Sequence, residues 1–462
     1  MKVEKKEGGV VEKCSGLLSF SYNSGMINRV CGNLENEDIR LKIKAFLLKD
    51  QKIERDSFIW NMAGSMLMAF QSVIMLMILT RTLGLKDAGI FTIAYANANL
   101  FLTVGKYGMR YFQISDMKGQ FSFVNYRMSR VVSSLAMMVT AVLYTAYAAM
   151  SNGYSAEKTQ VIVWMCLFKV VDAVEDVYHG FYQNRNRLDV GSKCMTLRIG
   201  ITIVVYGMGL IVLRNQLVSL MIATVLTTGL FVVFTKWTIG AFDVVKEKVD
   251  WKQVFALLKV CFPLFAGAFL SFYIGNAPKY AIDAMLTDEL QACYGFIAMP
   301  VFVIGLLNNF IFNPMLYKLS MMWNDGKVGQ FVRKILLQSL IVAGITLVCI
   351  IGAFLLGVPV LSWLYNTDLA PYKAELLLLL LGGGFLGLSG LLNAVITIIR
   401  YQKSLMWGYA VVALLALVCS NRIVGMYGMM GAAVLYTLLM AILCVIFVGL
   451  FAYGVMKQKK TL

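Results

Sequence analysis

The sequence predicts an all-α polytopic membrane protein with about twelve transmembrane helices. Its 462 residues are 59% hydrophobic and only 15% charged, and the mean hydropathy is +0.72. Soluble domains have about 25% charged residues, so this chain has too little polar surface to cover itself in water. Uncharged stretches such as Ser57–Thr80 and Ile335–Thr367 recur along the chain, and a helical span needs only about 20 apolar residues. Lipid is therefore the expected solvent.

Twelve stretches have the length and hydropathy of a membrane-spanning helix. The first six lie near 58–80, 88–109, 131–151, 160–182, 195–213 and 216–236. The second six lie near 254–277, 290–312, 335–357, 375–399, 404–421 and 430–455. We interpret residues 1–55, which precede them, as a cytoplasmic N-terminal extension. Its later part, EDIRLKIKAFLLKDQKIERD, has the composition of a surface helix.

The distribution of Lys and Arg predicts the orientation, because cytoplasmic loops are enriched in these residues. With the N-terminus inside, 34 of the 42 basic residues fall on cytoplasmic segments, seven fall on outer ends and loops, and one lies within a span. The distribution predicts a multi-pass protein of the cell (cytoplasmic) membrane with both termini in the cytoplasm. The net charge of +17 then belongs mainly to the cytoplasmic face and does not indicate nucleic-acid binding.

A weak internal repeat divides the chain into two halves. LTRTLGLKDAGIFTIA joins the first two spans, AIDAMLTDELQACYGFIAMP joins the seventh and eighth, and aligning Gly89 with Gly295 gives an offset of 206 residues. Many transporters are built from two such repeats with the substrate site between them. We therefore predict two six-helix lobes, residues 56–248 and 249–462.

The fourth predicted span carries charge along one face. Spacings of 3, 4, 3 and 4 separate Lys169, Asp172, Asp176, His179 and Gln183, which places them in one helical stripe. Lys169 lies about 14 Å into the span at 1.5 Å per residue, near mid-bilayer. Charges at this depth turn toward a bundle interior or an aqueous cavity. A structural ion pair between Lys169 and Asp172 is the alternative for that pair alone.

Basic residues occur at several other depths. Lys106 and Arg110 lie one turn apart at the cytoplasmic end of the second span, where topology alone also explains them. Lys279 lies at the outer end of the seventh span, and Arg81 at the outer end of the first. Basic groups at different depths around one cavity suit an anionic ligand, since Lys and Arg compensate phosphate charge where the dielectric constant is low.

The sequence lacks the motifs that are typical of several function classes. The sequence has no GxxxxGK[ST] phosphate loop, its nine cysteines are scattered without a CxxC pair, and it has one histidine. We therefore expect no cofactor, no metal site and no enzymatic activity.

Two stretches resemble the polysaccharide transporter family, the bacterial flippases of lipid-linked oligosaccharide repeat units of O-antigen or capsule type. Residues 57–116 contain a WN pair, the turn R-x-LG-x-x-D-x-G-x-F, and GKYGMRYFQISD after the second span. Residues 175–193, EDVYHGFYQNRNRLDVGSK, are similar to the exit of that family's fourth span. The family belongs to the multidrug/oligosaccharidyl-lipid/polysaccharide exporter superfamily.

The resemblance implies two lobes around a central cavity, alternating access, and a polyprenyl-pyrophosphate-linked oligosaccharide as cargo for surface polysaccharide export. The implied pyrophosphate-facing residues are Lys169, Arg110, Arg81 and Lys279. Asp172, Glu175, Asp176 and His179 would contact sugar, couple an ion or gate. Membrane lipids are expected partners, and a polysaccharide polymerase and chain-length machinery are further candidates.

Two alternatives remain open. A cation-coupled drug or small-molecule antiporter of the same superfamily would use a membrane-embedded carboxylate, for which Asp172 and Asp176 are the candidates. A membrane-bound polysaccharide polymerase or ligase would need a large outer loop with catalytic residues, and the outer segments predicted here are short.

Overall fold

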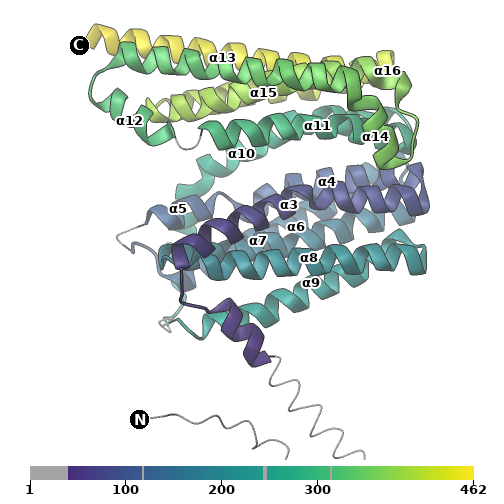
Figure 1. Cartoon of the computed structure of the whole chain (residues 1–462), viewed down its shortest axis with the longest axis horizontal. Helices are drawn as coiled ribbons and strands as arrows, with labels where there is room; N and C mark the ends of the chain where they lie inside the picture. Colours follow the sequence, from purple (N-terminus) through teal and green to yellow (C-terminus); the bar gives the residue numbers. More distant parts are fainter. Residues whose placement is uncertain (1–39, 117–118, 243–246, 313–314, 462) are drawn as a thin grey trace, which may run out of the picture.

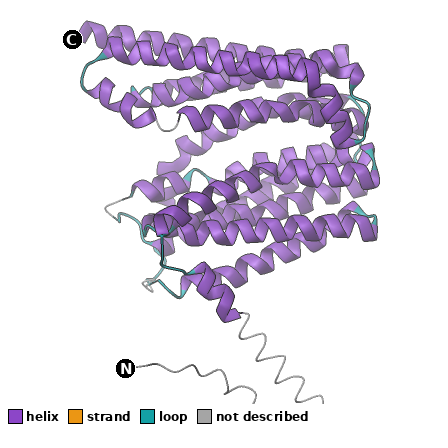
Figure 2. Cartoon of the chain, viewed as in Figure 1, coloured by secondary structure: helices purple, strands orange, loops and turns teal. Residues whose placement is uncertain are grey.

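The protein is helical throughout the part of the chain that the computed structural model describes (Figure 2). That part comprises residues 40–116, 119–242, 247–312 and 315–461, without the side chains of 306–312, 317 and 459–461. Most of the predicted N-terminal extension, residues 1–39, lies outside it. Within the described residues no strand is present. The predicted all-α class is confirmed.

The first lobe follows a short helix at residues 40–47 and occupies the lower half of Figure 1. It consists of α3 (Ile53–Leu83), α4 (Leu85–Lys106), α5 (Met109–Ser115), α6 (Phe123–Asn152), α7 (Ala156–Asn184), α8 (Leu188–Leu213) and α9 (Gln216–Ile239). Ser122, Ser155 and Asn215 accept hydrogen bonds from the first turns of α6, α7 and α9. Such N-caps fix where these helices begin.

The second lobe occupies the upper half of Figure 1. It consists of α10 (Trp251–Met285), α11 (Asp288–Phe312), α12 (Leu316–Asn324), α13 (Val328–Gly352), η2 (Ala353–Gly357), α14 (Val358–Tyr365), η3 (Ala370–Tyr372), α15 (Lys373–Ile398) and α16 (Gln402–Thr461). The short helices α5 and α12 follow the second long helix of their respective lobes, so the element order repeats. The predicted division at residues 248 and 249 falls between α9 and α10.

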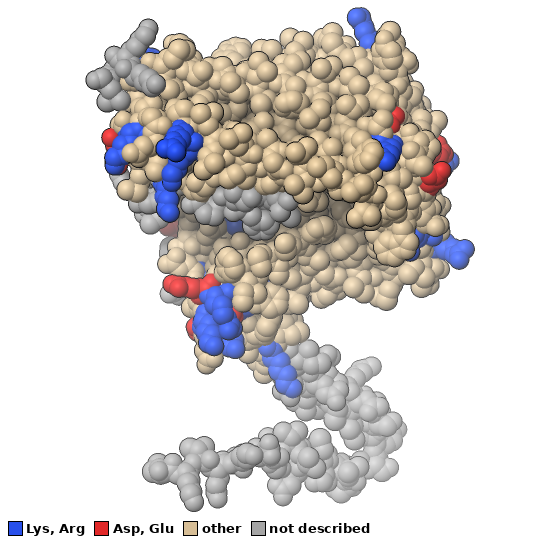
Figure 3. All heavy atoms as spheres, turned by 45° about the horizontal axis from the view of Figure 1, so that its top comes forward, with Lys and Arg blue, Asp and Glu red and all other residues tan. Residues whose placement is uncertain are grey.

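Each predicted span overlaps a helical segment, and their ends differ by up to eight residues. Among the described residues, nine helices are long and apolar enough to cross a membrane. The remaining predicted spans are α7, which is charged along one face, α11, whose last side chains lie outside the description, and the second half of α16. On the face shown in Figure 3, Lys and Arg gather toward the two ends of the molecule, with a broad uncharged band between them.

The long helix α16 is a hairpin of two spans. Gly428 has φ +57°, ψ −135°, outside the helical region, and a positive φ is readily adopted by glycine. Ring contacts pair Tyr401 with Tyr453 and Tyr409 with Phe447, at positions nearly equally distant from the turn. A Cβ on Gly431 would lie 2.6 Å from the carbonyl oxygen of Ile423, so the chain reverses tightly here.

The two lobes approach each other most closely where α4 meets α11, at the end predicted to face outward. A Cβ on Gly89 would lie 1.8 Å from the backbone oxygen of Asp288, and one on Gly295 would lie 2.8 Å from Cγ2 of Thr92. The two glycines aligned by the sequence repeat therefore lie at the same interface between the lobes. In Figure 1 the ribbons of the two lobes diverge toward the opposite end, where α5 and α12 lie.

We expect Gly89→Ala to separate the lobes at this end, because the atom that its Cβ meets belongs to the backbone and cannot rotate away. Nitroxide labels at Ser151→Cys and Asp368→Cys, exposed near this end on opposite lobes, report the separation by electron–electron double resonance in a background without native cysteines. The expected result is a longer distance. Gly229→Ala is the control, since a Cβ there meets nothing within 4 Å. An unchanged distance in Gly89→Ala would show that the packing accommodates the methyl group.

Candidate functional site

A cavity of about 490 Å³ lies between the two lobes. Its walls come from α3, α4 and α7 of the first lobe and from α10, α11, α15 and α16 of the second. Along α4 it extends from Phe91 to Lys106, which is about 22 Å at 1.5 Å per residue. Its volume falls within the range of about 300–1,000 Å³ that is usual for small-molecule sites.

Three lysines face this cavity from different helices: Lys106 on α4, Lys169 on α7 and Lys279 on α10. Lys106 is at the end of α4 nearest α5, Lys169 is near the middle of α7, and Lys279 is six residues before the outer end of α10. Asp172 is the one acidic residue among the described residues of the lining. The formal charge of the lining is therefore positive.

Lys169 is held in a defined position. Its Nζ donates hydrogen bonds to Oδ2 of Asp172 at 2.9 Å and to Oε1 of Gln71 at 3.1 Å. The same nitrogen lies 4.7 Å from the ring centroid of Tyr95, a cation–π contact. The structural ion pair considered for Lys169 and Asp172 therefore exists, and it exists in the wall of the cavity.

Lys279 and Lys106 differ from Lys169 because neither makes a hydrogen bond or an ion pair within the described part of the chain. Both are partly exposed, and both line the cavity. A lysine in such a position interacts strongly with an incoming anion, since no carboxylate has to be displaced.

A buried network behind the cavity joins α7 to α8. Arg198, 1% exposed, donates to Asp172 Oδ1 at 2.7 Å and to both oxygens of Glu175 at 3.2 and 2.6 Å. Its Nη1 also donates to Oγ1 of Thr227 at 2.7 Å. Asp172 is thus shared between Lys169 on the cavity side and Arg198 on the interior side. Glu175 is buried in this network and does not line the cavity.

Asp176 pairs with two arginines near the end of the first lobe where α5 lies. Arg130 lies 2.8 Å from its Oδ2 and Arg110 lies 3.8 Å from its Oδ1. Arg130 also donates to the carbonyl oxygen of Gly105 at 2.6 Å, and Arg110 to Oε1 of Gln183 at 3.1 Å. Neither Asp176 nor Arg110 belongs to the lining of the cavity. This group ties α4, α6 and α7 together.

His179 and Arg81 also lie away from the cavity. His179 is 3% exposed, and its Nε2 has no hydrogen-bond partner among the described residues. Arg81 donates to the carbonyl oxygens of Leu364 at 2.9 Å and Trp363 at 2.5 Å. These carbonyls lie at the C-terminal end of α14, where a cation is favourable. Arg81 therefore links the lobes at the outer end.

Lys158 forms a second link at that end, which the sequence analysis did not anticipate. Its Nζ lies 2.8 Å from Asp283 Oδ1 on α10 and 2.6 Å from Asp288 Oδ1 on α11. The hydroxyl of Tyr154 donates to the other oxygen of Asp283. The outer end of the first lobe is thus joined to both α10 and α11.

The predicted site residues therefore fall into three groups. Lys169, Lys279 and Asp172 line one cavity; Glu175, Asp176, His179 and Arg110 lie inside the first lobe or at its end nearest α5; and Arg81 bridges the lobes. Among the described residues, no group of three or more His, Cys, Asp and Glu is arranged to hold a metal ion.

No protein-family model matches the sequence, and no curated protein matches it. Several solved structures are similar to this chain. The lipid II flippase MurJ in an inward closed conformation is similar over 86% of this chain and 90% of its own, with a TM-score of 0.64 and 14% identity.

Two multidrug transporters are similar as well. An inward-facing multidrug resistance MATE family transporter of the MOP superfamily matches over 85% of this chain and 96% of its own, with a TM-score of 0.62 and 14% identity. The Vibrio cholerae MATE transporter VcmN in the bent form matches over 88% and 98%, with a TM-score of 0.56 and 11% identity. The chain shares their fold. The predicted two-lobed architecture is thereby confirmed.

Proposed function

We propose that this protein is a flippase that translocates polyprenyl-pyrophosphate-linked oligosaccharide repeat units across the cytoplasmic membrane for surface polysaccharide export. The observation that carries the proposal is the positively charged lining of the cavity between the lobes. Three lysines and one carboxylate face it from three helices, and two of the lysines make no ion pair within the described chain. The sequence resemblance to oligosaccharide flippases and the fold shared with a lipid II flippase support the same reading.

The lysines suit a pyrophosphate that moves along the cavity. Lys279, Lys169 and Lys106 follow one another from the outer third of α10 to the inner end of α4. An ammonium group binds phosphate as a point charge and adapts to its orientation. A pyrophosphate that leaves one lysine would therefore contact the next before it is hydrated by bulk water. Its negative charge would be compensated throughout its passage.

Aromatic and amide side chains of the lining suit the sugar. Tyr95, Tyr294, Phe91, Asn99 and Asn276 face the cavity. Aromatic rings offer apolar faces to sugar rings, and amides supply both donors and acceptors for hydroxyl groups. The polyprenyl chain, which is apolar, would remain in the bilayer.

Transport would proceed by alternating access with both termini in the cytoplasm. The lobes are joined at the outer end by Arg81, by Lys158 and by the contact at Gly89. In this arrangement the head group would enter from the cytoplasmic side, and breaking these links would release it outside. The excess of Lys and Arg on the predicted cytoplasmic segments supports this orientation.

A cation-coupled antiporter is the second candidate, since the MATE transporters share the fold. Such an antiporter needs a carboxylate that binds the cation. Asp172 reaches the cavity, but it already pairs with Lys169 and Arg198 at 2.9 and 2.7 Å. These two cations disfavour a third at the same carboxylate, so the observed pairing favours an anionic cargo.

Lys279→Gln tests the proposal with little risk to the fold, because Lys279 makes no ion pair with any described residue. We expect translocation of a polyprenyl-pyrophosphate-linked oligosaccharide into proteoliposomes to fall about 10- to 100-fold, the equivalent of one charge-assisted contact. Lys236→Gln, an exposed lysine of α9 outside the cavity, should translocate at the wild-type rate. Normal translocation by Lys279→Gln would exclude this lysine from cargo recognition.

A further inference from the structure

Residues 40–56, here called the basic segment, comprise the helix at 40–47 and the start of α3. In Figure 1 the basic segment is the short purple helix and the connecting stretch that leads from it into α3. The segment contains Arg or Lys at positions 40, 42, 44, 49, 52 and 55, against acids at 50, 54 and 56. In the sequence, the three acids of the segment balance half of its six positive charges.

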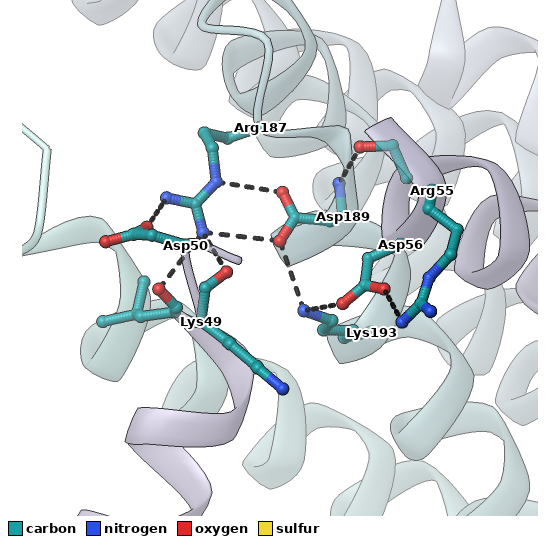
Figure 4. Close-up of polar contacts among 9 residues, drawn as sticks. Lys49, Asp50, Arg55, Asp56, Arg187, Asp189 and Lys193 are labelled. Carbon is teal, nitrogen blue, oxygen red and sulfur yellow. Dashed lines mark hydrogen bonds and ion pairs between the residues drawn. The ribbon is translucent and has the colours of Figure 1, made fainter. Parts of the chain in front are cut away.

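Two of the three acids are paired with basic residues outside the segment, and the side chain of Asp50 is itself 79% exposed. Asp50 accepts a hydrogen bond from Arg187 at 2.5 Å, and Asp56 lies 3.5 Å from Nζ of Lys193. Figure 4 shows Arg187 between Asp50 and Asp189, and Lys193 between Asp189 and Asp56. Asp189 and Lys193 are 0% and 1% exposed. The carboxylates of Asp50 and Asp56 are therefore engaged by the turn between α7 and α8.

Four lysines of the segment lie at the surface. Lys42, Lys44, Lys49 and Lys52 are exposed and make no ion pair within the described part of the chain. The segment therefore presents four exposed lysines without an ion pair among the described residues, while the charges of Asp50 and Asp56 are balanced by Arg187, Lys193 and Arg55.

Apolar side chains accompany these lysines on the outer surface. Leu41 is 62% exposed, Phe46 41%, and Phe58, at the start of α3, 69%. On the opposite side Leu47 is fully buried against Cys194 of α8 and Phe234 of α9. A helix that buries one side in protein and exposes both lysines and large apolar groups at the end of a membrane span is typical of the membrane interface.

We propose that the basic segment binds anionic phospholipid headgroups at the membrane surface. The lysines would contact the phosphates while Leu41 enters the acyl boundary, and each basic group near an anionic surface contributes measurably to such binding. The proposal rests on the membrane orientation described above and is independent of the identity of the cargo.

The binding would act on a defined part of the first lobe. Arg187 donates to the carbonyl oxygens of Leu48 and Lys49 at 3.2 Å, and the backbone N–H of Asp189 donates to Oγ of Ser57 at 3.1 Å. Lipid held by the segment would therefore fix the connection from α7, the helix that carries Lys169, to α8.

Hydrogen exchange of the full-length protein in nanodiscs tests the proposal. Backbone amides of residues 40–52 should exchange about tenfold more slowly in phosphatidylcholine mixed with phosphatidylglycerol than in phosphatidylcholine alone. High salt should remove the difference, since at 1 M the screening length is about 3 Å. The triple variant Lys42→Gln, Lys44→Gln, Lys49→Gln should exchange equally in both lipids.

A matched triple variant, Lys236→Gln, Lys252→Gln, Lys259→Gln, removes the same charge from exposed lysines of α9 and α10 and should keep the wild-type response. Arg187→Gln should speed exchange of the segment in both lipids while preserving the difference between them. Equal exchange of the wild type in both lipids, or an equal loss of response in both triple variants, would overturn the proposal.

Discussion

Lys169→Ala is expected to abolish translocation of lipid-linked oligosaccharide while the protein remains folded and inserted. Lys169 is the central one of the three cavity lysines, and an anion passing between Lys279 and Lys106 would lose its compensation at mid-cavity. The fold should persist because Asp172 keeps its 2.7 Å contact with Arg198 when Lys169 is removed. Translocation into proteoliposomes, with the melting temperature of the same preparation, measures both effects.

Lys169→Arg is the matched variant because it keeps the positive charge but changes its shape. We expect it to translocate at a reduced rate, since guanidinium cannot reproduce the position that Gln71, Asp172 and Tyr95 give to the ammonium. Translocation by Lys169→Ala at the wild-type rate would remove Lys169 from the mechanism.

Arg198→Ala is expected to cause the largest loss of stability. Its side chain compensates Asp172 and Glu175 at once and is 1% exposed. Removal leaves Glu175 buried without a cation within the described residues, and breaking a buried charge network in this way costs roughly 3–5 kcal/mol. The prediction is a clear fall of the melting temperature in detergent.

Arg214→Ala serves as the control, because this arginine lies exposed between α8 and α9. Its melting temperature should match that of the wild type. If Arg198→Ala were equally stable, the buried network would not hold α7 against α8. Comparing Arg198→Ala with Lys169→Ala distinguishes the roles of the two cations that pair with Asp172. Loss of Arg198 is expected to lower stability, and loss of Lys169 is expected to lower transport.

The spans could be predicted from sequence because hydropathy and length are local properties. The stripe on α7 could also be predicted, since a spacing of 3 and 4 residues defines one face whatever the neighbours are. The ion-pair partners of Glu175 and Asp176 could not be predicted from the sequence. Arg198 and Arg130 lie on other helices, and no local spacing pairs them with these two acids.

The sequence also does not predict which way a long side chain points. Arg81 and Lys279 both occupy outer span ends, yet Arg81 reaches the carbonyl oxygens of α14 while Lys279 faces the cavity. Lys106 and Arg110 are one turn apart, yet Lys106 lines the cavity and Arg110 contacts Asp176. These differences depend on how α10, α14 and α4 are placed in the fold, which no local pattern encodes.

The most direct test compares two cargoes in the same proteoliposomes. Wild-type protein is supplied with a fluorescent polyprenyl-pyrophosphate-linked oligosaccharide on one side and, separately, with a small cationic dye and an ion gradient. A lysine-lined path for an anionic cargo predicts translocation of the lipid-linked oligosaccharide, lost in Lys169→Ala, and no uptake of the dye. Gradient-driven uptake of the dye without translocation of the oligosaccharide would contradict the proposal and establish an antiporter.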